Sequence, residues 1–147
     1  MTSTRFLAVD KVIHRASSYR NSCGFDVFVR ESTSQIVLRV GTVGAIELAS
    51  AFGQRVVAAL PWPGPVIVRS DTTQPRLTIL TGPVPAHLRG GASFAALSST
   101  GAVLAAEGDE VLLPSPRDPA RRWLPHEPLD PYRPSAEVVV STILACR

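Results

Sequence analysis

The sequence has few of the residues and runs that mark a specialised class of protein. Its 147 residues include two cysteines, one methionine and one lysine, and aromatic residues make up 6%. No apolar run approaches the roughly 18 residues of a membrane-spanning helix, so we expect no membrane span. Residues 1–11 also lack the apolar stretch of a secretory signal, because Asp10 interrupts it. These absences predict a soluble, cytoplasmic protein.

Charged residues are also scarce, at 18% of the chain, whereas hydrophobic residues make up 45%. This balance is too apolar for intrinsic disorder, which needs low hydrophobicity and high net charge. A chain of this length fits one domain and can bury about two-thirds of its unfolded surface. We therefore expect a single globular domain over residues 1–147. The net charge of +3 is too small to indicate nucleic-acid binding by itself.

The two cysteines, Cys23 and Cys146, lie far apart in the sequence and form no metal-binding spacing. We expect two free, buried thiols. A disulfide between them is the alternative, and it requires an oxidising compartment.

The motifs of the common catalytic and cofactor sites are missing as well. Gly41 and Gly44 lack the lysine and serine of a phosphate-binding loop, and no nucleophile-elbow or Asp-x-Asp motif is present. The three histidines, His14, His87 and His126, do not have the spacing of a zinc-binding helix. We therefore predict no catalytic residue, no metal site and no cofactor.

Helical spacing of apolar residues predicts helices over residues 5–20 and 50–60, a short helix near 93–97, and a closing helix after the N-cap Ser135. The expected buried face of the first comprises Phe6, Val9, Ile13, Ala16 and Tyr19. That of the last comprises Val138, Val139, Thr142, Ile143 and Cys146.

Strands are expected in antiparallel pairs. The predicted hairpins are 25–30 with 35–40, 66–69 with 76–81, and 102–105 with 110–113 around the turn Gly108-Asp109, and a further strand covers 45–48. Strands that arrive in pairs, rather than alternating with helices, indicate the α+β class, with a mainly antiparallel sheet covered by helices on one face.

Residues 114–134 hold seven of the 13 prolines and should run over the surface as an ordered, extended strap. The strap carries arginines beside aromatic residues, and two more arginines flank the turn of the second hairpin. Together these candidate binding residues are Arg69, Arg76, Arg117, Arg121, Arg122, Trp123, Tyr132 and Arg133. Arginines among aromatics can follow a phosphate backbone and stack on bases. Alternatively, Trp123 anchors the strap to the core, or the set binds a protein partner.

Several segments also share their order with a known family: residues 19–24, 36–39, 44–46, 52–56, 64–67, 77–83, 111–116, 122–123 and 132–135. In this order the chain resembles short actinobacterial proteins that are similar to the N-terminal module of bifunctional primase–polymerases. The metal-binding Asp-x-Asp and the downstream catalytic histidine of such enzymes are absent in register. The resemblance therefore implies a degenerate module without catalytic residues.

Three functional hypotheses follow. The first is a non-enzymatic binding or accessory module, which the resemblance places in nucleic-acid transactions, with a protein partner as the other option. The second is a small-molecule enzyme whose pocket is assembled from dispersed residues such as His14, Asp26 and His126. The third is a homo-oligomeric structural protein, such as a homodimer, that pairs through an exposed sheet edge.

Overall fold

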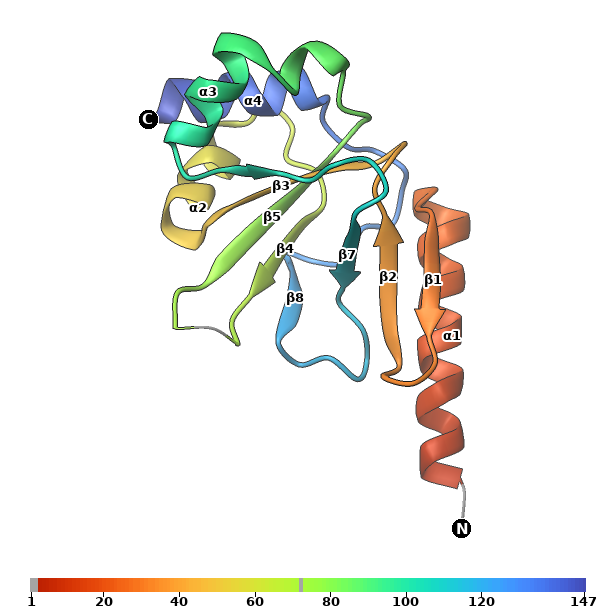
Figure 1. Cartoon of the computed structure of the whole chain (residues 1–147). Coiled ribbons are helices and arrows are strands. Elements are labelled where there is room, and N and C mark those ends of the chain that lie inside the picture. Colours follow the sequence, from red (N-terminus) through yellow and green to blue (C-terminus); the bar gives the residue numbers. More distant parts are fainter. Residues whose placement is uncertain (1–2, 72) are drawn as a thin grey trace.

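The computed structural model describes residues 3–71 and 73–147 (Figure 1). It confirms the α+β class. In chain order the elements are α1 (Ser3–Cys23), β1 (Val27–Arg30), β2 (Gln35–Arg39), β3 (Gly44–Ala49), α2 (Ser50–Ala59), β4 (Val66–Arg69), β5 (Arg76–Thr81), the 3-10 helix η1 (Ala86–Leu88), α3 (Gly91–Ser99), β6 (Val103–Leu104), β7 (Glu110–Leu113), β8 (Arg121–Leu124) and α4 (Ala136–Cys146).

The strands form two antiparallel sheets rather than one. The smaller has the order β1-β2-β7, and the larger has the order β6-β3-β5-β4-β8. Two predicted hairpins are confirmed: β1 pairs with β2, with Val27 opposite Leu38, and β4 pairs with β5, with Val66 opposite Ile79.

The third predicted hairpin is wrong, because β6 pairs with β3 whereas β7 pairs with β2. Residues 35–47 and 103–113 instead run beside each other as two bent strands. At the bend Val40 N donates to Asp109 O at 2.8 Å, and Gly108 N donates to Val40 O at 2.9 Å. Gly108 has a φ of +89°, and two residues facing one is the pattern of a β-bulge. The Gly108-Asp109 turn therefore bends its strand instead of reversing it.

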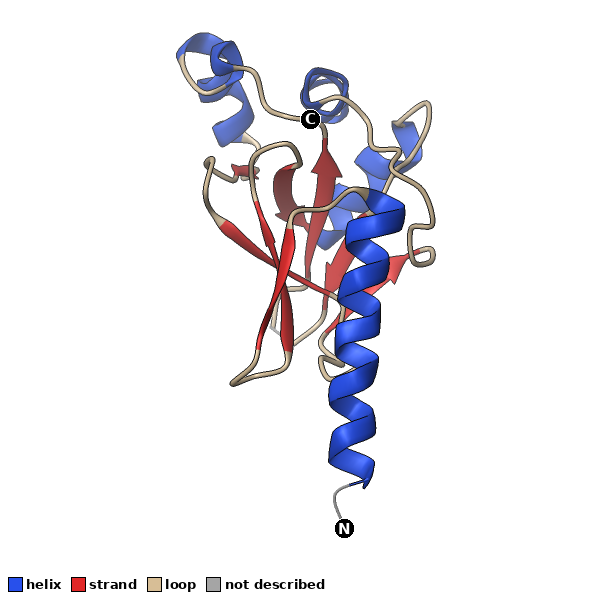
Figure 2. Ribbon diagram, turned by 90° about the vertical axis from the view of Figure 1, so that its right-hand side faces the viewer, coloured by secondary structure: helices blue, strands red, loops and turns tan. Residues whose placement is uncertain are grey.

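Each face of the five-stranded sheet covers a separate apolar core. One face packs against α2, α3 and α4 through buried residues such as Leu48, Val56, Leu77 and Ile143. The other face packs against α1 and the three-stranded sheet (Figure 2). Helices therefore lie on both sides of this sheet, and the prediction of one covered face is wrong.

Two helices bury only part of the stripe that was predicted: Ala16 and Tyr19 of α1 and Val139 and Ile143 of α4 are buried as expected. In α1 the buried residues are Val12, Ala16, Tyr19 and Cys23, while Val9 and Ile13 are 39% and 54% exposed. The side chain of Phe6 lies outside the described residues. In α4 the buried residues are Ala136, Val139, Val140 and Ile143, and Val138 is exposed. Both helices carry apolar residues on two neighbouring faces, so the elements that pack against them determine which face is buried.

α1 is the longest of the helices, with 21 residues. Within residues 3–71 and 73–147, none of the helices combines the length and the apolar character that crossing a membrane requires. Cys23 and Cys146 are both free, as predicted, but only Cys23 is buried and Cys146 is half-buried.

The proline-rich strap is held by its tryptophan. Trp123 is 7% exposed and its Nε1 donates to the Tyr19 hydroxyl at 2.9 Å. This confirms the hypothesis that Trp123 anchors the strap to the core. The strap was predicted to run extended over the surface, but its residues 121–124 form β8, which pairs with β4 at the edge of the sheet. Prolines on both sides of residues 121–124 obscured this strand, and an edge strand tolerates them.

Candidate functional site

A groove of about 470 Å³ lies on the face of the five-stranded sheet that also packs against α1 and the three-stranded sheet. Where this face is covered by α1 and the three-stranded sheet, it presents buried apolar residues such as Leu80 and Trp123. Where the cover ends, the same strands present Glu47, Thr78 and three arginines, which form the floor of the groove. The change from apolar to charged residues along these strands marks the groove as the open part of one continuous sheet face.

The three arginines of the floor stand side by side on neighbouring strands. Arg69 on β4 lies opposite Arg76 on β5 and also opposite Arg121 on β8. We call these three residues the arginine row. Like charges directly opposite each other destabilise a sheet, so this arrangement needs compensation from carboxylates.

Each member of the row has its own carboxylate partner. Arg76 Nε donates to Glu47 Oε1 at 2.7 Å, Arg69 Nε to Asp71 Oδ1 at 2.6 Å, and Arg121 Nη1 to Asp118 Oδ2 at 2.7 Å. The Arg121–Asp118 pair is the most enclosed, with side chains 12% and 11% exposed. The carboxylates allow three guanidinium groups to share one row.

The pairing leaves the row able to bind an anion. The hydrogen bond to Asp71 raises the pKa of Arg69 and lowers the pKa of Asp71, so both groups are charged at neutral pH. A guanidinium group has five N–H donors, and the bonds from Arg69 and Arg76 to their carboxylates use Nε alone. The terminal Nη groups of these two residues are therefore not used in those pairs.

One wall of the groove is β7 with the residue before it. Asp109, Glu110, Val111 and Leu112 all line the groove. The carboxylates at this wall are also partnered within the chain: Glu110 pairs with Arg30, and Asp109 Oδ2 accepts from Ala106 N at 2.8 Å. The groove thus has a floor that carries the arginine row and a wall that carries the carboxylates of Asp109 and Glu110.

The remaining arginines predicted for the site lie outside the groove. Arg122 follows Arg121 on β8 and points to the opposite sheet face, and Arg117 lies in the turn before β8. Both are exposed, and the described residues give neither side chain a carboxylate partner. Arg133 Nη1 donates to Cys23 O at 3.0 Å, and its guanidinium lies over the Phe25 ring. Burial lowers the pKa of Arg133.

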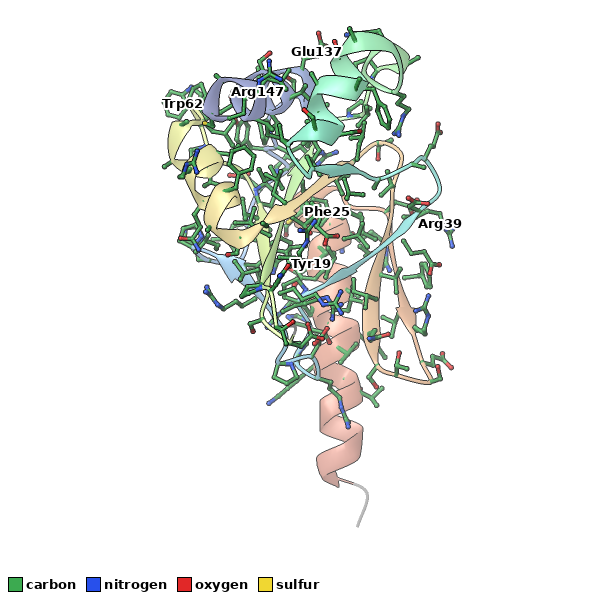
Figure 3. The ribbon with its side chains drawn as sticks, turned by 60° about the vertical axis from the view of Figure 1, so that its left-hand side comes forward. Tyr19, Phe25, Arg39, Trp62, Glu137 and Arg147 are labelled. Atoms are coloured by element: carbon green, nitrogen blue, oxygen red, sulfur yellow. The ribbon has the colours of Figure 1, made fainter. Side chains whose placement is uncertain are left out.

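The aromatic candidates do not join the arginines. Trp123 belongs to the core with Tyr19 and Phe25, two rings that Figure 3 shows in the interior between α1 and the sheets. Tyr132 is 45% exposed elsewhere, and its hydroxyl donates to Trp62 O at 2.8 Å. Stacking of bases on aromatics beside the arginine row therefore has no support from this geometry.

The residues suggested for an enzymatic pocket are also placed apart. His14 is exposed on α1, Asp26 lines a shallow hollow with Gly41 and Gly108, and His126 lines another beside Tyr132. Among the residues that the structure describes, no three His, Cys, Asp or Glu side chains gather where they could hold a metal ion.

Sequence reasoning missed Glu47, Thr78 and Asp109 as parts of the site. Local patterns place Asp109 in a turn and single out neither Glu47 nor Thr78, because they do not show the pairing of distant strands. The available signal was a polar residue within each of two apolar strands, Glu47 in β3 and Thr78 in β5, which lie opposite each other.

Comparison with known proteins found no matching family model, no matching curated protein and no matching solved structure. The resemblance to primase–polymerase modules therefore stays a prediction.

Proposed function

We propose that this protein is a non-enzymatic binding module that takes an anionic macromolecular partner in the groove. The observation that carries the proposal is the arginine row, in which register brings Arg69, Arg76 and Arg121 together on an open sheet face. Arginine binds carboxylate and phosphate groups with two parallel hydrogen bonds, and the row offers several such sites in one place.

Positive charge extends beyond the row at the same end of the sheet. Arg117 lies before β8 and Arg122 lies on it, and the described residues give neither a carboxylate partner. These two unpaired charges attract an anionic partner from a distance, and the attraction weakens as salt is added.

Accessory work in nucleic-acid transactions is the narrower form of this proposal, and it depends on the resemblance to primase–polymerase modules. Among the residues that the structure describes, no aromatic side chain lines the groove. Contacts made there are therefore ionic contacts and hydrogen bonds to phosphate or carboxylate groups rather than base stacking.

Heparin chromatography tests the proposal, with heparin serving as a general polyanion. We expect retention that falls steeply with salt and elution of Arg69→Gln at lower salt than the original protein. Arg147→Gln is the matched control, since it removes the same charge beside α4, away from the groove (Figure 3). Absence of retention at about 50 mM salt, or equal shifts for the two variants, would contradict the proposal.

A further inference from the structure

We propose that the occupant of the groove is an extended, acidic polypeptide segment that adds as a strand to the free edge of β7. This inference rests on the proposed function, because it names the kind of anionic partner that the groove takes.

The first support is the orientation of β7. It is the last strand of its sheet, bonded to β2 on one side, and its other side has no strand partner among the described residues. Successive side chains of a strand point to opposite faces. Four successive residues, Asp109 to Leu112, can line one groove only if the edge of the strand faces it.

The hydrogen-bond pattern gives the same orientation. Val40 N donates to Asp109 O, so Asp109 directs its carbonyl toward the strand of Val40. Main-chain groups of successive residues in an antiparallel pair point alternately toward the partner and away from it. The N–H and C=O groups of Glu110 and Leu112 therefore point away from β2 and into the groove. An added strand can pair with these groups.

The second support is the spacing of the charges. Neighbouring strands lie about 4.8 Å apart, so the arginine row extends about 10 Å across β5, β4 and β8. Alternate residues of an extended segment share a face and stand about 7 Å apart. This repeat lies between the roughly 5 Å that separates adjacent arginines and the roughly 10 Å that separates the outer two, so the charge spacing of an acidic segment is of the same scale as that of the row.

The acidic wall of the groove, formed by Asp109 and Glu110, favours a polypeptide over a nucleic acid. A nucleic-acid strand carries one negative charge per nucleotide, and some of these would lie against Asp109 and Glu110. A polypeptide can place acidic residues only where the arginines are. It also supplies the main-chain donors and acceptors that the edge of β7 requires, which a phosphate backbone does not.

The test is an NMR titration of the full-length, ¹⁵N-labelled protein with three probes of about eight units each. They are a peptide of alternating Glu and Thr, its Lys and Thr counterpart, and oligothymidylate. We expect the acidic peptide alone to shift the amides of Glu110 and Leu112 and to slow their hydrogen exchange at least about tenfold. We also expect Arg69→Gln to weaken its binding about tenfold.

A backbone variant tests the edge itself. Leu112→Pro deletes an N–H that faces the groove and leaves the bonds to β2, so we expect a folded protein that no longer binds the peptide. Unchanged peptide binding by this variant would overturn the inference. Should Leu112→Pro not fold, the exchange rates of the original protein still decide the matter.

The outcomes separate the two proposals. If oligothymidylate binds at the arginine row without protecting the amides of β7, the anionic partner stands and the acidic polypeptide is wrong. Protection of β7 that rises with protein concentration alone would make a second copy of this chain the occupant, which also contradicts the inference. If no probe binds, the proposed function itself fails.

Discussion

Trp123 and Tyr19 are joined by a 2.9 Å hydrogen bond from the indole Nε1 to the phenol oxygen, and the same hydroxyl donates to Pro114 O at 2.7 Å. The two rings meet edge to face, with centroids 5.6 Å apart. One buried hydroxyl therefore holds together α1, the start of the strap and β8. Because β8 carries Arg121, this contact also fixes one end of the arginine row.

Tyr19→Phe tests this contact. The substitution leaves a buried indole N–H and a buried carbonyl without their partner, so we expect the free energy of unfolding to fall by about 2 to 4 kcal/mol. Urea denaturation followed by tryptophan fluorescence measures it. Tyr132→Phe is the control, since its hydroxyl lies at the surface, and it should cost less than about 1 kcal/mol. Equal losses in the two variants would mean that the buried hydroxyl has no special role.

Stability should also fall at alkaline pH because of Tyr19. Burial raises the pKa of its hydroxyl above the value in the unfolded chain. Above about pH 10 the unfolded state loses this proton while the folded state keeps it, so the free energy of unfolding decreases as pH rises. Denaturation midpoints between about pH 8 and pH 11 should show this decline in the original protein and less of it in Tyr19→Phe. Identical pH profiles would contradict the assignment.

Asp118 should matter most to the stability of the arginine row. Asp118→Ala leaves the largely enclosed Arg121 beside Arg69 without its carboxylate, and we expect the free energy of unfolding to fall by about 1 to 3 kcal/mol. Asp71→Ala should lower the free energy of unfolding much less than Asp118→Ala, because the pair of Asp71 with Arg69 is exposed to solvent and screened by it. A double-mutant cycle of Asp118→Ala with Arg121→Ala measures the coupling, and a coupling near zero would show that the pair does not stabilise the row.

Gly44 and Gly41 provide a test of the close approach of β3 and β5 where β3 begins. A Cβ at Gly44 would lie 2.5 Å from Thr81 Oγ1 and 2.9 Å from Gly82 O, whereas a Cβ at Gly41 meets nothing within 4 Å. We expect Gly44→Ala to destabilise the protein by about 1 to 3 kcal/mol. Gly41→Ala should change stability by no more than about 0.5 kcal/mol. Thermal unfolding by calorimetry compares them, and similar midpoints would contradict this close approach of β3 and β5.

Local patterns in the sequence predicted most elements, because helix spacing and strand alternation depend on neighbouring residues. Pairing between distant strands was beyond such patterns. Gly108-Asp109 has the composition of a hairpin turn, yet β6 and β7 belong to different sheets, because each pairs with a part of the bent strand of residues 35–47. The same residues are compatible with a hairpin turn and with a β-bulge, and this tertiary pairing decides which of the two forms.

The candidate site shows the same limit. The hairpin of β4 and β5 already placed Arg69 beside Arg76, so two members of the row could be predicted together. Arg121 joined them only through β8, a strand concealed by the prolines around it. A tryptophan anchor was among the hypotheses for Trp123, but the sequence could not show that Arg121 lines the groove while Arg122 faces away from it, because this requires the register of β8 on β4.

The most direct test of the account measures binding of fluorescently labelled poly-glutamate by anisotropy for two double variants with the same net charge. Arg69→Gln/Arg76→Gln alters the arginine row, and Arg39→Gln/Arg147→Gln alters arginines outside it. If the row is the binding surface, the first variant should lose at least about tenfold in affinity and the second no more than about threefold. Equal losses would show that overall charge, and not the groove, attracts the anion, and would contradict the account.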